Sequence, residues 1–416
     1  MKVLNLKYKR KDIFEIVALA SFLCFPLIKH ILAYISYIFN LKIHGDFLSI
    51  IILYFPILLL IKLEKKIPAD FLVLITSIVI FYLTTRLLHP EYEFWYTRDY
   101  YGVWEYVLKP SNGIYIYLFF RLVKRADNAK KAMKISAYIM LIYYLYILID
   151  AIKRGYWINT DFKGNIIKMD YDLTFGYNVL LFTLISLSEF LKNKKLVDIL
   201  YFVLGIGLIF LGGSRGPLLG IMIYVFMKII TSINVLRNNK QFLKLFITLG
   251  SLLIISLLIY IYWDMFISFL IRTNPNSRTL NMLIDGNIIT DNGRNRIWRA
   301  AIDMIKRNPL GYGMMGTRHV IYYFHDVGHP HQIFLEILVD FGVVIGGIII
   351  MSLFYNIIKQ FRNYNNSWHE VLLIFIARAS HLLISGTFWH IYAFWGLIAI
   401  IKNSELENIK NLKKAN

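Results

Sequence analysis

The stretch NGRNRIWRAAIDMIKRNPLGYGMMGTRHVIYYFHDVGHPHQIFLEILVDFGVVIG, residues 292–346, joins a polar segment rich in arginine, histidine and glycine to a long apolar run. The apolar span, residues 342–358, is close to the length of helix that crosses a hydrocarbon core of roughly 30 Å. A second apolar run, residues 242–271, precedes the polar segment. The polar segment is therefore expected to lie at a membrane surface between two transmembrane helices.

The composition of the whole chain agrees with a membrane protein. Its 416 residues are 57% hydrophobic, 16% aromatic and 17% charged, with a mean hydropathy of +0.55, which lies outside the range of soluble domains. The lone cysteine, Cys24, excludes an intrachain disulfide and a cysteine-based metal site. The first apolar run continues well past the Ala-x-Ala at Ala18–Ala20, so we expect an uncleaved first transmembrane helix.

The apolar runs predict an all-α fold, a polytopic transmembrane helical bundle that forms a single membrane domain over residues 1–416. A template of about 20 apolar residues per crossing gives about twelve spans. Their approximate limits are 13–39, 47–61, 71–88, 113–123, 132–152, 173–191, 196–211, 217–233, 242–271, 342–358, 371–385 and 389–401.

The distribution of positive charge predicts the topology. The net charge is +20, and most lysines and arginines fall in clusters on one side of the predicted spans, which places both termini in the cytoplasm. The charge therefore gives no reason to expect a nucleic-acid partner. The large loop of residues 272–330, between the ninth and tenth spans, is basic although it faces outward. An anionic ligand explains this exception better than orientation does. Within the loop, residues 297–307 read as an amphipathic helix.

Three motifs carry the candidate chemistry, and the first is GGSRGPLLG, residues 212–220. Its glycines and Ser214 allow a tight turn with exposed amide donors, and Arg215 lies at the positive end of a helix that Pro217 opens. This combination suits a phosphate. The alternative is an interhelical turn with one snorkelling arginine.

The second motif is GRNRIW followed by NPLGYGMMG, residues 293–298 and 308–316. Arg294 and Arg296 are suited to hold a pyrophosphate through bidentate hydrogen bonds. The alternative is a solvated basic loop that touches anionic lipid head groups.

The third motif is HPHQIFLEILVDFGVVIGG, residues 329–347. His331 starts the apolar helix, where an imidazole can act as a general base or donate a hydrogen bond to a leaving oxygen. His329 lies two residues before it. We expect Gly342, Gly346 and Gly347 to mark contacts with neighbouring helices. A purely structural role for the histidines is the alternative.

Two further residues, Arg378 and His381, lie three apart in the eleventh predicted span and share one helix face. Ionisable residues at membrane depth are functional candidates. The structural alternative is helix pairing through Asp150 or a carbonyl.

Taken together and in this order, SRG before a helix, GR..IW with NPLGYG, and H-Q-x-F-L-E-x-L-x-x-x-G-x-x-G resemble the bacterial O-antigen polymerase and ligase superfamily. The resemblance covers residues 212–347. The chain departs from the family where Gln332 follows the histidine in place of the frequent Asn, and where the NPLGYG turn is one residue shorter than the commoner form.

The resemblance implies a type-C membrane glycosyltransferase that needs no cofactor and no metal. Its donor would be an oligosaccharide on undecaprenyl pyrophosphate at the outer face of the bacterial inner membrane. Arg215 and Arg294 would bind the pyrophosphate, with Ser214 and Arg296 nearby, and His331 would serve the acceptor hydroxyl or the departing phosphate. Arg378, His381 and His329 are additional candidates.

The expected function is that of a polysaccharide polymerase, which uses a lipid-linked repeat unit as acceptor and works with a chain-length regulator protein. The alternatives are a ligase that transfers polymer to the lipid A core and, in another class, a lipid-linked oligosaccharide flippase or exporter.

Overall fold

The computed structural model describes residues 2–40, 45–98, 101–160, 165–169, 171–214, 216–235, 293–322 and 328–415, with single positions 265, 268, 272 and 284. The chain divides into two compact units. The first holds residues 1–140, 161–165 and 291–416, and the second holds residues 141–160 and 166–290. Arg215 of the first motif and most of the ninth predicted span lie outside the described residues.

The first unit is helical in its described part. Its elements are α1 (Lys2–Leu23), α2 (Phe25–Ile38), α3 (Gly45–Glu64), α4 (Ala69–Leu88), η1 (Pro90–Tyr92), α5 (Glu93–Thr97), the π-helix η2 (Trp104–Leu108), η3 (Gly113–Tyr115), α6 (Ile116–Leu122), α14 (Arg294–Arg307), α15 (Thr317–Ile321), α16 (Ile333–Phe361), α17 (His369–Ala379), η4 (Ser380–Leu383) and α18 (Tyr392–Ala415). Helix α7 (Ala126–Arg154) starts in this unit and continues into the second.

The first predicted span is not one continuous helix. It forms α1 and α2, whose axes are bent by 73° at Cys24. Pro26 lies in the first turn of α2 and has no amide hydrogen to bond the carbonyl one turn earlier, so the ladder is interrupted at this point. The expected single first transmembrane helix is thus a bent pair of helices in the structure.

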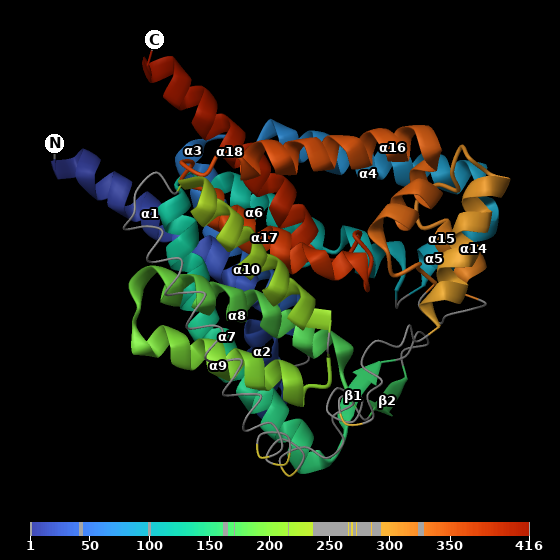
Figure 1. Ribbon diagram of the computed structural model, residues 1–416, viewed down its shortest axis with the longest axis horizontal. Helices are drawn as coiled ribbons and strands as arrows, with labels where there is room; N and C mark the ends of the chain where they lie inside the picture. The colour runs from blue at the N-terminus through green and yellow to red at the C-terminus, as the bar shows by residue number, and fades with distance from the viewer. Residues whose placement is uncertain are drawn as a thin grey trace. The chain divides into compact units, whose positions relative to one another are not determined.

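The short helix α6 forms the centre of the first unit. Each of its seven residues is buried. The ring of Phe119 contacts Phe22 of α1 at 4.7 Å and Tyr54 of α3 at 5.7 Å. The ring of Phe120 contacts Phe375 of α17 at 5.0 Å. Helix α6 therefore joins the N-terminal helices to the C-terminal pair α17 and α18, as Figure 1 shows.

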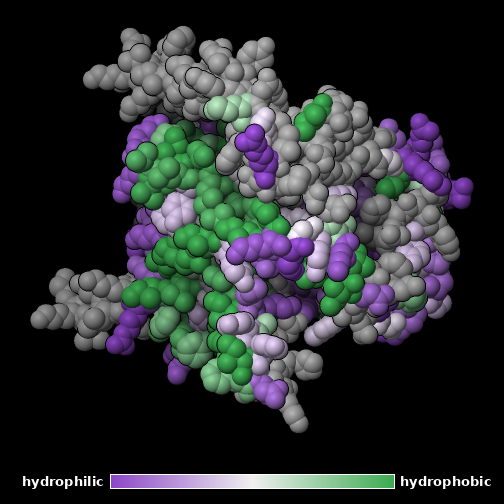
Figure 2. All heavy atoms as spheres, turned by 90° about the horizontal axis from the view of Figure 1, so that it is seen from below, coloured by the Kyte–Doolittle hydropathy of each residue, from purple (hydrophilic) through white to green (hydrophobic). Residues whose placement is uncertain are grey.

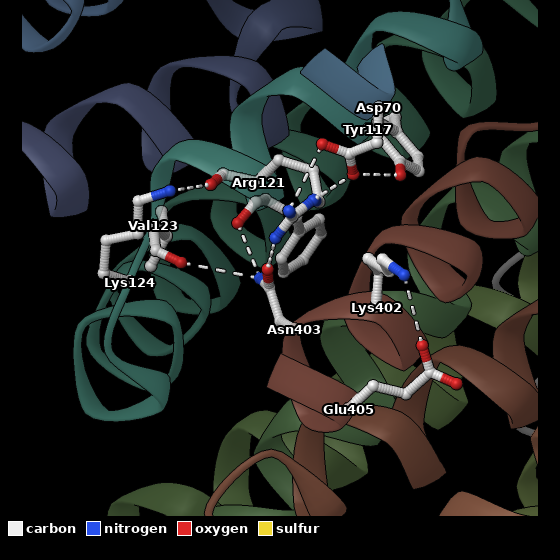
Figure 3. A network of polar contacts seen from close by, with 9 residues as sticks. Asp70, Tyr117, Arg121, Val123, Lys124, Lys402, Asn403 and Glu405 are labelled. Carbon is white, nitrogen blue, oxygen red and sulfur yellow. Dashed lines mark hydrogen bonds and ion pairs between the residues drawn. The ribbon is translucent and has the colours of Figure 1, made fainter. Parts of the chain in front are cut away.

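A polar network closes one end of α6. Arg121 donates from Nε to Asp70 Oδ2 at 2.5 Å and also bonds Asn403 of α18. Tyr117 donates to the same Asp70 oxygen at 2.5 Å, and Asn403 donates to the carbonyl of Phe120 at 2.8 Å. Figure 3 shows that these side chains converge from α4, α6 and α18, so the buried guanidinium on α6 is bonded by side chains of two other helices.

The second unit contains the rest of α7, a hairpin of β1 (Trp157–Thr160) and β2 (Ile166–Met169), and helices α8 (Leu173–Asn193), α9 (Leu196–Leu211) and α10 (Gly216–Val235). The two strands are antiparallel, with Trp157 opposite Met169 and Thr160 opposite Ile166. Helices α8 and α9 pack closely at Gly205, which has no side chain. A Cβ at this position would lie only 2.3 Å from Thr183 Oγ1. Apart from the small hairpin, the described part agrees with the predicted all-α class.

Five described helices are long and apolar enough to cross a membrane, and the bent α1–α2 pair would be a sixth. They are Phe47–Glu64, Ala69–Leu88, Ala126–Arg154, Thr174–Asn193 and Ile333–Phe361. Large apolar side chains on them are exposed, such as Val73 at 66% and Ile348 at 65%. Figure 2 draws another face, on which a broad group of apolar side chains is bordered by hydrophilic ones. The structure thus supports a multi-pass membrane protein, but it does not confirm the predicted number of about twelve spans.

Candidate functional site

The glycine-rich turn of residues 308–313 docks onto a break in α16. Gly342 has φ 77° and ψ 171°, which interrupts the helix. Val343 donates its amide to the carbonyl of Pro309 at 2.8 Å, and the carbonyl of Val339 accepts from Tyr312 at 2.8 Å. A continuous helix would have joined Val343 to Val339 directly. The break leaves the Val343 amide and the Val339 carbonyl without their helical partners, and the turn supplies a hydrogen-bond partner for each. Backbone polar groups within a membrane need such partners.

The glycines at this junction are needed for close backbone approach. A Cβ at Gly342 would lie 2.4 Å from the carbonyl oxygen of Leu310, and one at Gly311, which has φ +98°, would lie 2.5 Å from the amide nitrogen of Gly342. The expected contact with a neighbouring helix is not seen at Gly347, because no atom of the described residues lies within 4 Å of its Cβ position, and Gly346 faces the backbone of its own helix across the break.

Helix α14 lies over the same region and brings the second and third motifs together. Its buried residues Ile297, Ala301 and Met304 pack with Ile321 of α15 and Val339 of α16. The indole of Trp298 donates from Nε1 to the carbonyl of Pro330 at 3.0 Å. The GRNRIW motif is thereby fixed against the HPH segment, within one unit.

The two loop arginines lie in the first turn of α14. Gly293 caps the helix in the left-handed conformation, Arg294 is half-buried and Arg296 is exposed. The N-terminal turn of a helix carries a partial positive charge. Two guanidinium groups at this position are suited to bind an anion. The first turn of α14 contains no acidic residue.

The histidines lie at the start of α16. The rings of His329 and His331 are 4.3 Å apart, and His331 has a left-handed backbone with φ 54°. Gln332 caps α16, since its Oε1 accepts from the amide of Leu335 at 2.6 Å. The Gln332 side chain thus accepts a hydrogen bond from the third amide of the helix. This N-cap role is the one expected of the Asn that the family often has at this position.

Arg378 and His381 are in direct contact. Nη1 of Arg378 and Nδ1 of His381 are 3.2 Å apart, and both side chains are buried. The guanidinium also lies over the ring of Tyr392, 5.4 Å from its centre. The carboxylate of Asp150, the alternative partner in the sequence analysis, accepts instead from Arg154 at 2.5 Å.

Sequence reasoning missed a buried cluster of Arg318, Glu336 and Asp340, each at most 2% exposed. The guanidinium of Arg318 bonds the carbonyl of Tyr101 and lies 4.7 Å from the ring centre of Tyr106. Burial lowers the pKa of Arg318 below its ordinary value.

The two carboxylates hold the segment between η4 and α18. Glu336 accepts from the Thr387 hydroxyl at 2.5 Å and from the amide of Phe388 at 3.3 Å, and Asp340 accepts from Trp389 Nε1 at 2.9 Å. The sequence signal for this cluster was the pair of acidic residues, Glu336 and Asp340, which lie one helical turn apart inside an apolar segment.

The first motif belongs to the second unit. Ser214 is buried there, and a Cβ at Gly176 of α8 would lie 2.6 Å from the Ser214 Cβ. Gly213 has φ +78°, so the tight turn occurs before α10. Arg215 lies outside the described residues. The joint pyrophosphate site of Arg215 and Arg294 therefore stays a prediction.

Comparison with known proteins supports the family resemblance over part of the chain. Residues 200–351 match the O-antigen ligase family. The matched segment contains all three motifs and the described helices α14 and α15, and it ends within α16. It confirms the resemblance to the O-antigen polymerase and ligase superfamily. Neither the curated proteins nor the solved structures gave a match to the chain.

The family match supports a membrane enzyme of the O-antigen polymerase or ligase type. Within the described residues, no group of three or more His, Cys, Asp or Glu side chains is arranged to hold a metal ion. The polar groups near the family motifs are instead arginines, histidines and two hydrogen-bonded carboxylates, which suit the binding of an anion and the transfer of a proton.

Proposed function

We propose that the protein is a polysaccharide polymerase that transfers a glycan from undecaprenyl pyrophosphate onto a lipid-linked repeat unit. The reaction would take place at the outer face of the bacterial inner membrane, with both termini in the cytoplasm. The family match carries this proposal, because the matched residues 200–351 contain both arginine motifs, the histidines and the first part of α16. The arrangement of α14 over the start of α16 supports it.

In the proposed reaction the acceptor hydroxyl attacks the anomeric carbon of the donor sugar. The bond from that carbon to the pyrophosphate oxygen breaks, and its electron pair stays on the phosphate. Arg215 and Arg294, with Arg296 and Ser214 nearby, would bind the leaving pyrophosphate and stabilise its growing charge. His331 would accept the proton of the acceptor hydroxyl. A single displacement inverts the configuration at the anomeric carbon.

A ligase is the second candidate, because the matching family is described by that activity. A ligase would use the same donor with the lipid A core as acceptor. A lipid-linked oligosaccharide flippase or exporter is a third candidate of another class, and it would move its substrate between leaflets without forming a bond.

The purified protein in detergent separates these candidates. Incubation with defined lipid-linked repeats should give a ladder of lengthened products, and addition of lipid A core should leave the ladder unchanged. A single transfer that depends on lipid A core would favour the ligase. No product in detergent, with translocation in sealed vesicles, would refute the enzyme proposal.

A further inference from the structure

Arg318 of α15 joins two segments that are far apart in the chain. Its guanidinium donates to the carbonyl of Tyr101 and lies 4.7 Å from the ring centre of Tyr106. Its Cα and Cβ lie 3.1 and 3.2 Å from the Cβ position of Gly328, which has φ +67°. Gly328 directly precedes the HPH segment, residues 329–331. Arg318 therefore holds the segment of the two tyrosines beside the histidines.

The ring of Tyr106 stacks on the imidazole of His390. The two ring centres are 4.7 Å apart, and the ring planes are inclined by 28°. The ring of Tyr101 lies against the same tyrosine, with the centres 5.3 Å apart. His390 is exposed and both tyrosines are half-buried. These three rings, which we call the aromatic platform, thus form a surface that a ligand can reach.

The segment that carries His390 is bonded to α16. The Thr387 hydroxyl donates to Glu336 at 2.5 Å, and Trp389 donates from Nε1 to Asp340 at 2.9 Å. Helix α16 also begins directly after the HPH segment. His390 and the histidines are thus attached to the same helix, and Arg318 supplies a second connection through Tyr106. A binding surface fixed by rigid elements can place a substrate accurately.

The chemistry of the aromatic platform fits a sugar ring. A phenol or imidazole ring has a flat apolar face and a polar edge. A pyranose likewise has a face of C–H bonds and hydroxyl groups around its edge. An acyl chain would leave the polar edges of the platform without partners. The Arg318 guanidinium is 2% exposed and bonded to the Tyr101 carbonyl, so the platform favours an uncharged sugar over a pyrophosphate.

We propose that the aromatic platform binds the acceptor sugar whose hydroxyl reacts, and that Arg318 is the positioning residue that holds this sugar beside His331. This inference deepens the proposed transferase function and rests on it. The predicted topology places both segments of the platform on the outer side, with the loop of residues 272–330. The donor pyrophosphate would be bound separately by the arginine motifs, so loss of the platform should weaken acceptor binding alone.

Binding is measured without turnover on the full-length protein in detergent. The probe is an alkyl glycoside of the repeat unit, which can accept a glycan but has no pyrophosphate to lose, and saturation-transfer-difference NMR gives its Kd. His390→Ala should weaken binding about tenfold through loss of the stacked ring. His390→Phe keeps a flat ring and should restore most of the affinity. His319→Ala, exposed on α15, is the matched control and should bind as the wild type does.

Thermal melting checks the fold of each variant, and His390→Gln replaces His390→Ala if the latter does not fold. Wild-type affinity in the folded variant without the ring would overturn the proposal. So would an equal loss of affinity in His390→Phe, or the absence of glycoside binding to the wild type.

The transfer reaction provides the second readout, with a lipid-linked repeat as donor and the glycoside as acceptor. In His390→Ala the KM for the glycoside should rise about tenfold, whereas the KM for the donor and the kcat should not change. A merely structural role would instead lower kcat or raise both KM values, and either result would overturn the proposal.

Arg318→Lys tests the positioning role, because an ammonium group keeps the charge but not the planar fork of the guanidinium. It should lower kcat more than it raises the KM for the glycoside, since the bound sugar is no longer held beside His331. Wild-type kcat in this variant would overturn the role of Arg318. If the glycoside binds as expected but the wild type transfers no glycan to it, the proposed function fails while the sugar site stands.

Discussion

The substitution Gly342→Ala tests the docking of the glycine-rich turn onto α16. Gly342 has φ 77° and ψ 171°, a region that essentially only glycine adopts. An alanine there costs about 1–3 kcal/mol of backbone strain. Its Cβ would also lie 2.4 Å from the Leu310 carbonyl oxygen, and moving this carbonyl weakens the neighbouring backbone bond from Val343 to Pro309, worth about 1 kcal/mol. We expect a loss of about 3 kcal/mol.

Thermal melting in detergent, followed by fluorescence-detected size-exclusion chromatography, measures this loss. Gly347→Ala is the matched control on the same helix, because its Cβ position has no atom within 4 Å in the part of the chain that the structure describes. Alanine at a helix interior should stabilise this variant by about 0.5–1 kcal/mol relative to glycine. If Gly342→Ala melts as high as Gly347→Ala, the account of the break in α16 is refuted.

Two further substitutions address the core and the site. Arg121→Met leaves Asp70 and Asn403 without their guanidinium partner and should destabilise by about 2–3 kcal/mol, less than a fully buried pair because Asp70 is partly exposed. The control, Lys402→Met, removes the more exposed ion pair with Glu405 that Figure 3 also draws, and it should cost less than about 1 kcal/mol. Equal melting temperatures of the two variants would contradict the stabilising role of the Arg121 network. Arg294→Ala should lower the rate of glycan transfer, measured with saturating lipid-linked repeats, about 100-fold because the leaving group loses its stabilisation. Arg299 is exposed on the same helix, so Arg299→Ala should keep the wild-type rate. Equal rates in both variants would exclude Arg294 from the site.

Much of the helical fold follows from hydropathy, but the interruptions of the helices do not. Pro26 was a visible signal for the break between α1 and α2. The break in α16 had a weaker signal, because Gly342 lies in a continuous apolar run and a glycine at helical spacing commonly marks helix packing. Its left-handed backbone depends on a turn more than 25 residues earlier in the chain, which no local pattern reports.

The sequence motifs marked segments that the structure brings together, although the roles of their residues stay predictions, and the sequence did not reveal which polar residues are buried. Trp298 and Pro330 are joined by one hydrogen bond, so the second and third motifs, both singled out in the sequence, meet in the structure. Arg318 looked like one more basic residue of the loop, yet it is 2% exposed. Its burial depends on the Tyr101 carbonyl and the Tyr106 ring, which come from a segment over 200 residues away.

The central claim is that the protein forms a glycosidic bond by displacing a polyprenyl pyrophosphate. The most direct measurement incubates purified protein in detergent with a defined lipid-linked repeat, counts polyprenyl pyrophosphate released against linkages formed, and determines the anomeric configuration of the product by NMR. We predict one pyrophosphate released per linkage, with inversion at the donor carbon. Linkages with retained configuration, or no release of polyprenyl pyrophosphate, would contradict the account.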